Sequence, residues 1–108
     1  EGRIQGVTPL TEIVDILLNN KCLLLCDGGD KVKEFNIFGK YLTPGSYIMA
    51  HDYASNKNNF KEEVKDKIWN WFEIQDSDVQ LVMNEYNIIK SKYYKQFSSV
   101  AWLQFKKK

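Results

Sequence analysis

Two short apolar stretches of this chain each end in an acidic residue. Cys22–Cys26 is a continuous apolar run that leads to Asp27, and Ser46–His51 leads to Asp52. The segment between them has the length of a helix, which predicts a β-α-β unit with parallel strands and a right-handed crossover. Ligands of open α/β sheets bind outside the carboxyl ends of the strands, so Asp27 and Asp52 are the candidate catalytic residues.

The chemistry expected of Asp27 and Asp52 is the binding of a cation. Two carboxylates close together repel each other unless they share a cation or a proton, and Mg²⁺ is a suitable partner because it needs few protein ligands. His51 is a candidate third ligand, and it would favour a softer metal such as Fe²⁺ or Mn²⁺. The alternative is that Asp27 caps a turn, Asp52 begins a loop and His51 makes a local hydrogen bond. Gly28 and Gly29 either let the backbone approach a ligand or only form a tight turn.

Length and composition indicate one globular domain over residues 1–108. The chain is 44% hydrophobic with a net charge of +1, which argues against a nucleic-acid-binding surface. No apolar run approaches the ~20 residues of a membrane span, and the first residues lack the features of a signal peptide. Cys22 and Cys26 are interpreted as small core residues in a reducing compartment. These features predict a cytoplasmic protein that binds neither nucleic acid nor membrane.

Hydrophobic periodicity predicts the elements that position the candidate site. Thr8 and Pro9 begin a helix that ends at Asn19 and Asn20, and Asp30 caps a second helix. The inward-facing residues of these two helices follow helical spacing: Leu10, Ile13, Val14, Leu17 and Leu18 in the first, and Val32, Phe35, Phe38 and Leu42 in the second. Thr43-Pro44-Gly45 is the turn before the second strand.

The second half of the chain predicts helices and then a closing pair of strands. The expected elements, in order, are a loop over Tyr53–Asn59, a short helix over Phe60–Lys67, an aromatic cluster over Ile68–Phe72, a helix capped by Asp76 or Ser77, and strands over Ile88–Tyr94 and Ser98–Phe105. A short Lys95-Gln96-Phe97 link would join the two strands as a hairpin. The aromatic cluster either covers the sheet or forms a wall beside a substrate.

The acidic strand ends, the Pro44-Gly45-Ser46 turn and the terminal Val100–Lys106 stretch together resemble the second half of class I S-adenosylmethionine-dependent methyltransferases. The similarity is greatest to the branch of cephalosporin hydroxylase-like and other cation-dependent members. It covers roughly residues 9–108. The fold that it implies is α/β: a partial, Rossmann-like three-layer sheet with a parallel start and a C-terminal antiparallel β-hairpin.

The resemblance also implies a function and a set of site residues. The chain would transfer a methyl group from S-adenosylmethionine to a hydroxyl or similar group of a small-molecule substrate. Asp27, Gly28 and Gly29 would lie at the cofactor, and Asp27, His51 and Asp52 would hold Mg²⁺ or another divalent cation. The glycine-rich cofactor loop of the family has no counterpart in this sequence. A missing N-terminal half or a second copy of the chain would therefore cover the open sheet edge. The alternative function is a non-catalytic assembly or interaction module.

Overall fold

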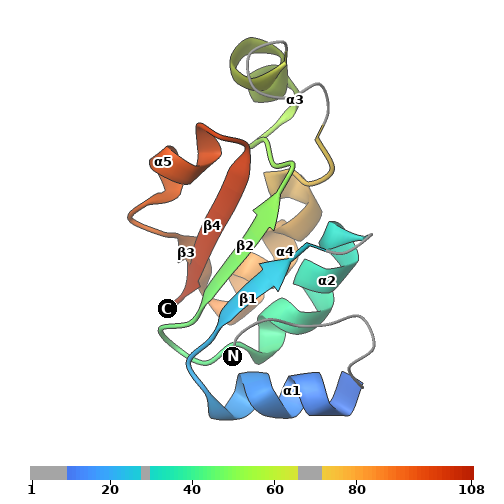
Figure 1. Cartoon of the computed structure of the whole chain (residues 1–108), viewed down its shortest axis with the longest axis vertical. Coiled ribbons are helices and arrows are strands. Elements are labelled where there is room, and N and C mark those ends of the chain that lie inside the picture. The colour runs from blue at the N-terminus through green and yellow to red at the C-terminus, as the bar shows by residue number, and fades with distance from the viewer. Residues whose placement is uncertain (1–9, 28–29, 66–71) are drawn as a thin grey trace.

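Four strands form one mixed sheet. The computed structural model describes residues 10–27, 30–65 and 72–108 (Figure 1). The strand order is β1-β2-β4-β3, and the strands are β1 (Leu23–Cys26), β2 (Tyr47–His51), β3 (Ile88–Lys90) and β4 (Trp102–Lys107). Strands β1 and β2 are parallel, and β4 is antiparallel to both β2 and β3. The prediction of an α/β protein with a parallel start and an antiparallel end is confirmed.

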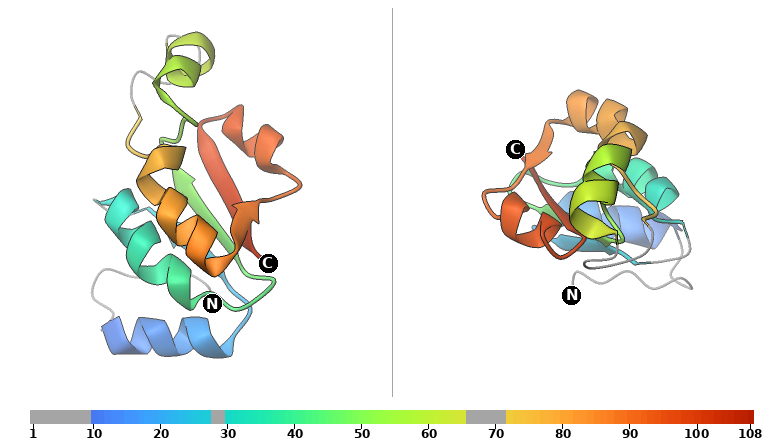
Figure 2. Two further views of the ribbon diagram at one scale, coloured as in Figure 1. Left: turned by 180° about the vertical axis from the view of Figure 1, so that it is seen from behind. Right: turned by 90° about the horizontal axis from the view of Figure 1, so that it is seen from above.

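Helices precede and follow each parallel strand. The longer ones are α1 (Leu10–Asn19), α2 (Lys31–Phe38) and α4 (Asp76–Tyr86), and the shorter ones are α3 (Lys57–Asn59) and α5 (Tyr94–Ser98). A 3₁₀ turn follows α2 over Gly39–Tyr41, and a π-helical turn follows α3 over Phe60–Val64. Helices α2 and α4 lie side by side over one face of the sheet (Figure 2). Helix α1 lies near the end of the sheet at which β1 and β2 begin (Figure 1).

The core lies between the sheet and helices α2 and α4. Because side chains alternate along a strand, residues in register share a face: Leu24 with Ile48, Cys26 with Ala50, Ile48 with Phe105, and Ala50 with Leu103. All of these are buried. They pack in one cluster with Phe35 of α2 and with Val79 and Met83 of α4. The predicted inward positions are confirmed at Ile13, Leu17 and Phe35. Leu18 was also expected to face inward and is 54% exposed, and Leu42 is buried but lies after the end of α2.

The opposite face of β1 and β2 is less covered. Leu23 is 48% exposed, and Leu25, Tyr47 and Met49 are half-buried. No described helix lies over these two strands on this face (Figure 1). The described residues therefore show a four-stranded open sheet with its helix layer on one face, and a three-layer arrangement is not confirmed.

The short link predicted between the last two strands is wrong. Strand β3 ends at Lys90, and helix α5 occupies Tyr94–Ser98, where the link and the strand ends were expected. Ser91 explains the early end of β3: its hydroxyl donates to Gln104 Oε1 at 2.7 Å and accepts from the Tyr93 amide at 3.2 Å. These bonds begin a turn that leads into α5. Strand β4 consequently starts later, at Trp102, and runs to Lys107.

The predicted cap of α4 is also wrong, and the capping residue is Gln75. Its backbone amide donates to Asp78 Oδ2 at 3.0 Å in a capping box. Asp76 instead accepts a hydrogen bond from the Tyr53 hydroxyl at 2.5 Å, and this hydroxyl also lies 2.7 Å from the Tyr94 hydroxyl. Burial, followed by these hydrogen bonds, raises the pKa of Tyr53. The phenol therefore ties the chain after β2 to both α4 and α5.

The segment before α4 differs in part from its prediction. Helix α3 begins at Lys57, inside the expected loop, after Asn56 caps it by accepting from the Asn59 amide at 2.8 Å. The expected helix over Phe60–Lys67 is a π-helical turn as far as Val64. Residues 66–71, which include Trp69 and Trp71 of the aromatic cluster, lie outside the described residues, as do Thr8 and Pro9. Phe72 contacts Phe60, with ring centroids 4.8 Å apart.

Candidate functional site

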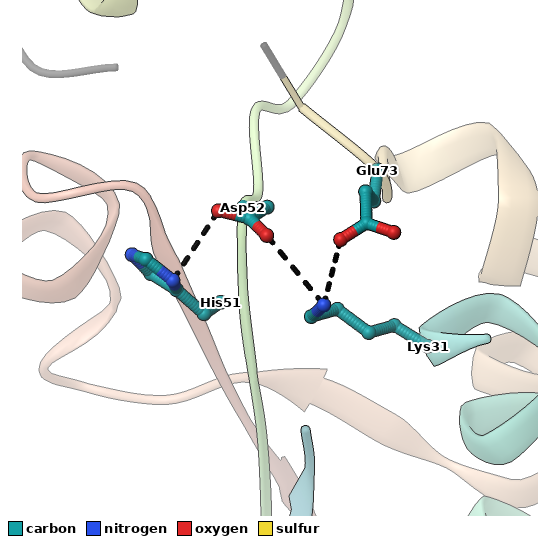
Figure 3. Close-up of polar contacts among 4 residues, drawn as sticks. All are labelled: Lys31, His51, Asp52 and Glu73. Atoms are coloured by element: carbon teal, nitrogen blue, oxygen red, sulfur yellow. Dashed lines mark hydrogen bonds and ion pairs between the residues drawn. The ribbon is translucent and has the colours of Figure 1, made fainter. Parts of the chain in front are cut away.

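A buried lysine joins two carboxylates at the carboxyl end of β2 (Figure 3). The Lys31 ammonium lies 2.7 Å from Glu73 Oε1 and 3.5 Å from Asp52 Oδ2. The side chains of Lys31 and Asp52 are 7% and 10% exposed, whereas that of Glu73 is 30% exposed. The three side chains come from α2, from the residue after β2 and from the segment before α4. These side chains lie at the carboxyl ends of the parallel strands, where a ligand was predicted.

Local backbone structure brings these side chains together. Asp30 caps α2 by accepting from the Lys33 amide at 3.0 Å, which makes Lys31 the first residue of the helix. Asp52 has a φ of 59°, a left-handed conformation that Asp tolerates better than most residues. Its carbonyl oxygen accepts from the Glu73 amide at 2.8 Å and from the Ile74 amide at 3.3 Å. Asp52 therefore positions Glu73 through its backbone and Lys31 through its side chain.

The cluster is electrostatically matched. Burial alone would lower the pKa of Lys31, but the hydrogen bond and charge of Glu73, together with Asp52, outweigh burial and raise it. The hydrogen bond from Lys31 lowers the pKa of Glu73. Because each partner favours the charged form of the other, Lys31 and Glu73 are an ion pair at neutral pH.

Asp52 has one carboxylate oxygen that Lys31 does not reach. Asp52 Oδ1 is buried and makes no hydrogen bond within residues 10–27, 30–65 and 72–108. His51 Nδ1 lies 3.2 Å from this oxygen, and the His51 ring packs on Trp102 with ring centroids 4.8 Å apart. A buried carboxylate oxygen without a hydrogen bond costs free energy. The group that faces this oxygen is His51 Nδ1.

The predicted site residues are only partly brought together. His51 and Asp52 are adjacent and in contact, whereas Asp27 is exposed at the end of β1 and takes no part in the Lys31 ion pairs. Gly28 and Gly29 lie outside the described residues. In the part of the chain that is described, no group of three or more His, Cys, Asp or Glu side chains is arranged to hold a metal ion. The positive charge beside Asp52 is the Lys31 ammonium.

Sequence reasoning missed Lys31, Glu73 and the packing of Trp102 on His51. Lys31 could have been found from the sequence. It directly follows the helix cap Asp30, which comes soon after strand β1, so the helix that begins at Lys31 starts beside the carboxyl end of that strand. Glu73 had none, since it reaches Asp52 through a long connection and an isolated bridge between Tyr53 and Ile74. Trp102 is placed by the antiparallel pairing of β4 with β2, which sets it in register with His51.

Cys26 lies beneath this edge as an unreactive core residue. It is 1% exposed, and burial raises the pKa of its thiol to about 12. Cys22 is half-buried, and both cysteines are free. A thiolate is the reactive form of cysteine, so the prediction that Cys26 serves as a small core residue is confirmed.

The ion pair predicts how stability depends on pH. The raised pKa of Lys31 stabilises the fold below about pH 10, and this stabilisation is lost as pH rises through the folded value. The lowered pKa of Glu73 stabilises the fold above about pH 4, and this is lost as pH falls through the folded value. Glu73→Gln is expected to lower the free energy of unfolding by about 1 kcal/mol at pH 7, since the pair is partly solvated.

Urea unfolding of both proteins from about pH 3 to pH 8 measures this effect. The difference between them should shrink toward the acidic end. Glu12→Gln, on an exposed position of α1, is the matched control and should leave the curve unchanged. A Glu73→Gln effect that is the same at every pH would contradict an ionic origin.

Comparisons with known proteins leave the site without an external precedent. No family model, no curated protein and no solved structure matches this chain. None of the helices within residues 10–27, 30–65 and 72–108 has both the length and the apolar character needed to cross a membrane.

Proposed function

We propose that this chain is a methyltransferase-like partial domain with a Rossmann-like sheet, which binds S-adenosylmethionine and a small hydroxyl-bearing substrate at the carboxyl edge of β1 and β2. The observation that carries the proposal is the gathering of polar side chains at that edge. Lys31, Asp52 and Glu73 converge there from separate elements, and Asp27 ends the neighbouring strand. The parallel pair followed by antiparallel strands supports the resemblance on which the proposal rests.

Different residues of the chain would bind the cofactor and the substrate. Asp27, with Gly28 and Gly29 beside it, would hold the cofactor, which supplies an electrophilic methyl group when bound. Asp52 Oδ1 would accept a hydrogen bond from the substrate hydroxyl once the His51 ring turns away from it, because this oxygen makes no hydrogen bond in the described part of the chain. Lys31 holds the Asp52 carboxylate through its other oxygen, so the acceptor atom keeps a fixed direction. Such positioning accounts for a large share of catalysis in reactions between two bound molecules.

The divalent cation stays a prediction, with Asp27, His51 and Asp52 as its ligands. The part of the site that fits it is the pair of atoms Asp52 Oδ1 and His51 Nδ1, which lie 3.2 Å apart. Lys31 already neutralises Asp52 through Oδ2, so a cation would add to this charge balance rather than create it. We therefore expect any metal to strengthen cofactor or substrate binding without being required for the fold.

Isothermal titration of S-adenosylmethionine tests the proposal, with and without Mg²⁺ or Mn²⁺. We expect measurable binding by the wild-type chain, and a loss of at least about tenfold in affinity for Asp27→Asn. Asp15→Asn, which changes an exposed carboxylate on α1, is the matched control and should bind like the wild type. Absence of binding in every condition would contradict the proposal for this chain.

A non-catalytic interaction module is the alternative function. It is favoured by the exposed edge of β1, where Leu23 is 48% exposed, and by the lysine that already neutralises Asp52. Titration separates the two functions, because a module of this kind has no reason to bind S-adenosylmethionine.

A further inference from the structure

Among the described residues, the outer edge of β1 has no strand paired with it. In the sheet order β1 has β2 on one side, and no described segment pairs with its other side. Edge strands normally carry charges, prolines or bulges that prevent pairing with another chain. Leu23–Cys26 carries no charge and no proline, whereas the opposite edge strand, β3, is shorter and includes Lys90. The two edges of the sheet therefore differ in how well they are protected.

Backbone direction identifies the groups that this edge offers. The Tyr47 amide donates to the Cys22 carbonyl at 2.9 Å, so the backbone groups of Cys22 point toward β2. Backbone groups of successive strand residues point to opposite edges. Leu24 and Cys26 therefore face β2 like Cys22, and Leu23 and Leu25 direct their amide and carbonyl groups outward.

Charged residues flank these leucines at alternate positions, on the same face of the strand. Lys21 precedes Leu23 by two residues, and Asp27 follows Leu25 by two residues; both charged side chains are exposed. The Lys21 side chain lies against Gly45, on the β2 side of the strand, so it has to turn outward to meet a second copy. Gly45 comes two residues before Tyr47, the register partner of Leu23. A basic residue, two leucines and an acidic residue therefore follow one another on the same face of this strand edge.

We propose that this edge pairs with the β1 edge of a second copy of the chain, forming an antiparallel two-fold dimer. In such a dimer hydrogen-bonded pairs form between outward-facing residues. Three of the possible registers pair leucine with leucine: Leu23 with Leu23, Leu25 with Leu25, or Leu23 with Leu25. Only the last register sets Lys21 opposite Asp27 of the second copy, and the two-fold axis repeats that contact. Charge complementarity therefore selects both the partner and the register.

The dimer continues the sheet across two molecules. Each Leu23–Leu25 pair exchanges both backbone hydrogen bonds, and opposite charges facing each other across an antiparallel pair add a modest attraction. The paired strands are short, so the dimer is expected to be weak. Asp27 is also proposed to hold the cofactor, whereas the backbone pairing of Leu23 and Leu25 and the Lys21 side chain take no part in cofactor binding. Lys21→Asp therefore tests the dimer separately from S-adenosylmethionine binding.

Sedimentation velocity tests the dimer over a concentration range from about 1 to about 200 µM. We expect the wild type to pass from monomer to dimer in this range. Lys21→Asp and Asp27→Lys each set like charges opposite one another, so each should raise the dissociation constant at least about tenfold. Lys33→Asp, an exposed position on α2, is the matched control and should dimerise like the wild type.

Mixing the two charge variants gives the sharpest result. In a mixed dimer the carboxylate introduced by Lys21→Asp faces the ammonium introduced by Asp27→Lys, and the two unchanged side chains face each other, so both contacts are attractive again. The mixture should form a heterodimer, detected by native mass spectrometry, and this also shows that both variants are folded. A wild type that is monomeric at about 200 µM would overturn the proposal and leave the edge to another protein or to further chain. Variants that dimerise as tightly as the wild type would overturn the register.

Discussion

Replacing Lys31 with Met is expected to lower the free energy of unfolding by about 3 kcal/mol. The Lys31 side chain is 7% exposed, and its ammonium faces both Asp52 and Glu73 in Figure 3. Methionine fills similar space without a charge, so the substitution leaves Asp52 as a buried carboxylate without its ion-pair partner. Removing one member of a buried pair is far more destabilising than removing both, since an uncompensated charge remains in the interior. Urea unfolding at pH 7 measures the difference.

A double-mutant cycle separates the charge effect from loss of packing. Lys31→Met combined with Asp52→Asn should be less destabilised than the sum of the two single variants, by at least about 1 kcal/mol. Lys33→Met, two residues along α2 and exposed, is the matched control and should change stability by less than about 0.5 kcal/mol. Equal effects at the two lysines would show that the Lys31 ion pairs contribute nothing to stability.

The parallel start of the sheet was predictable because its signals are local. Leu23–Cys26 is uninterrupted by polar residues, which identifies it as a strand, although β1 is an edge strand with Leu23 exposed rather than a strand covered on both faces. Asp30 occupies a cap position whose geometry depends only on the next three residues. The same local reasoning located His51 and Asp52 at the end of β2. At that position it predicted two carboxylates that share a cation. Predicting the full set of side chains there would have required knowing that Lys31 and Glu73 also lie at this end of the strand.

The rest of the site depends on contacts between distant parts of the chain. Lys31 and Glu73 are separated by 42 positions and meet at 2.7 Å, and no periodicity within either segment encodes that contact. The end of β3 depends in a similar way on Ser91 meeting Gln104, which stops the strand before the position that its apolar pattern suggests. Side chains that pair over long sequence separations decided both outcomes, and pattern analysis of a single sequence does not register such pairs.

Phe105→Ala is expected to lower the free energy of unfolding by about 4 kcal/mol. Phe105 is fully buried on β4, where its ring meets Phe35 of α2 at 5.9 Å and both Tyr53 and Tyr94 at 6.1 Å between centroids. Alanine would leave a cavity at the point where the sheet, α2 and α5 meet, and cavities in well-packed cores are filled only partly by relaxation.

Because Tyr53 directly follows Asp52, the cavity from Phe105→Ala should also loosen the candidate site. Tyr93→Ala is the matched control, because it removes an aromatic ring that is 45% exposed and should cost less than about 1 kcal/mol. Thermal and urea unfolding of the two variants give the comparison. A Phe105→Ala loss below about 2 kcal/mol would mean that the ring is not the packing centre of the fold. In that case the position of Asp52 would depend mainly on its own backbone bonds to Glu73 and Ile74.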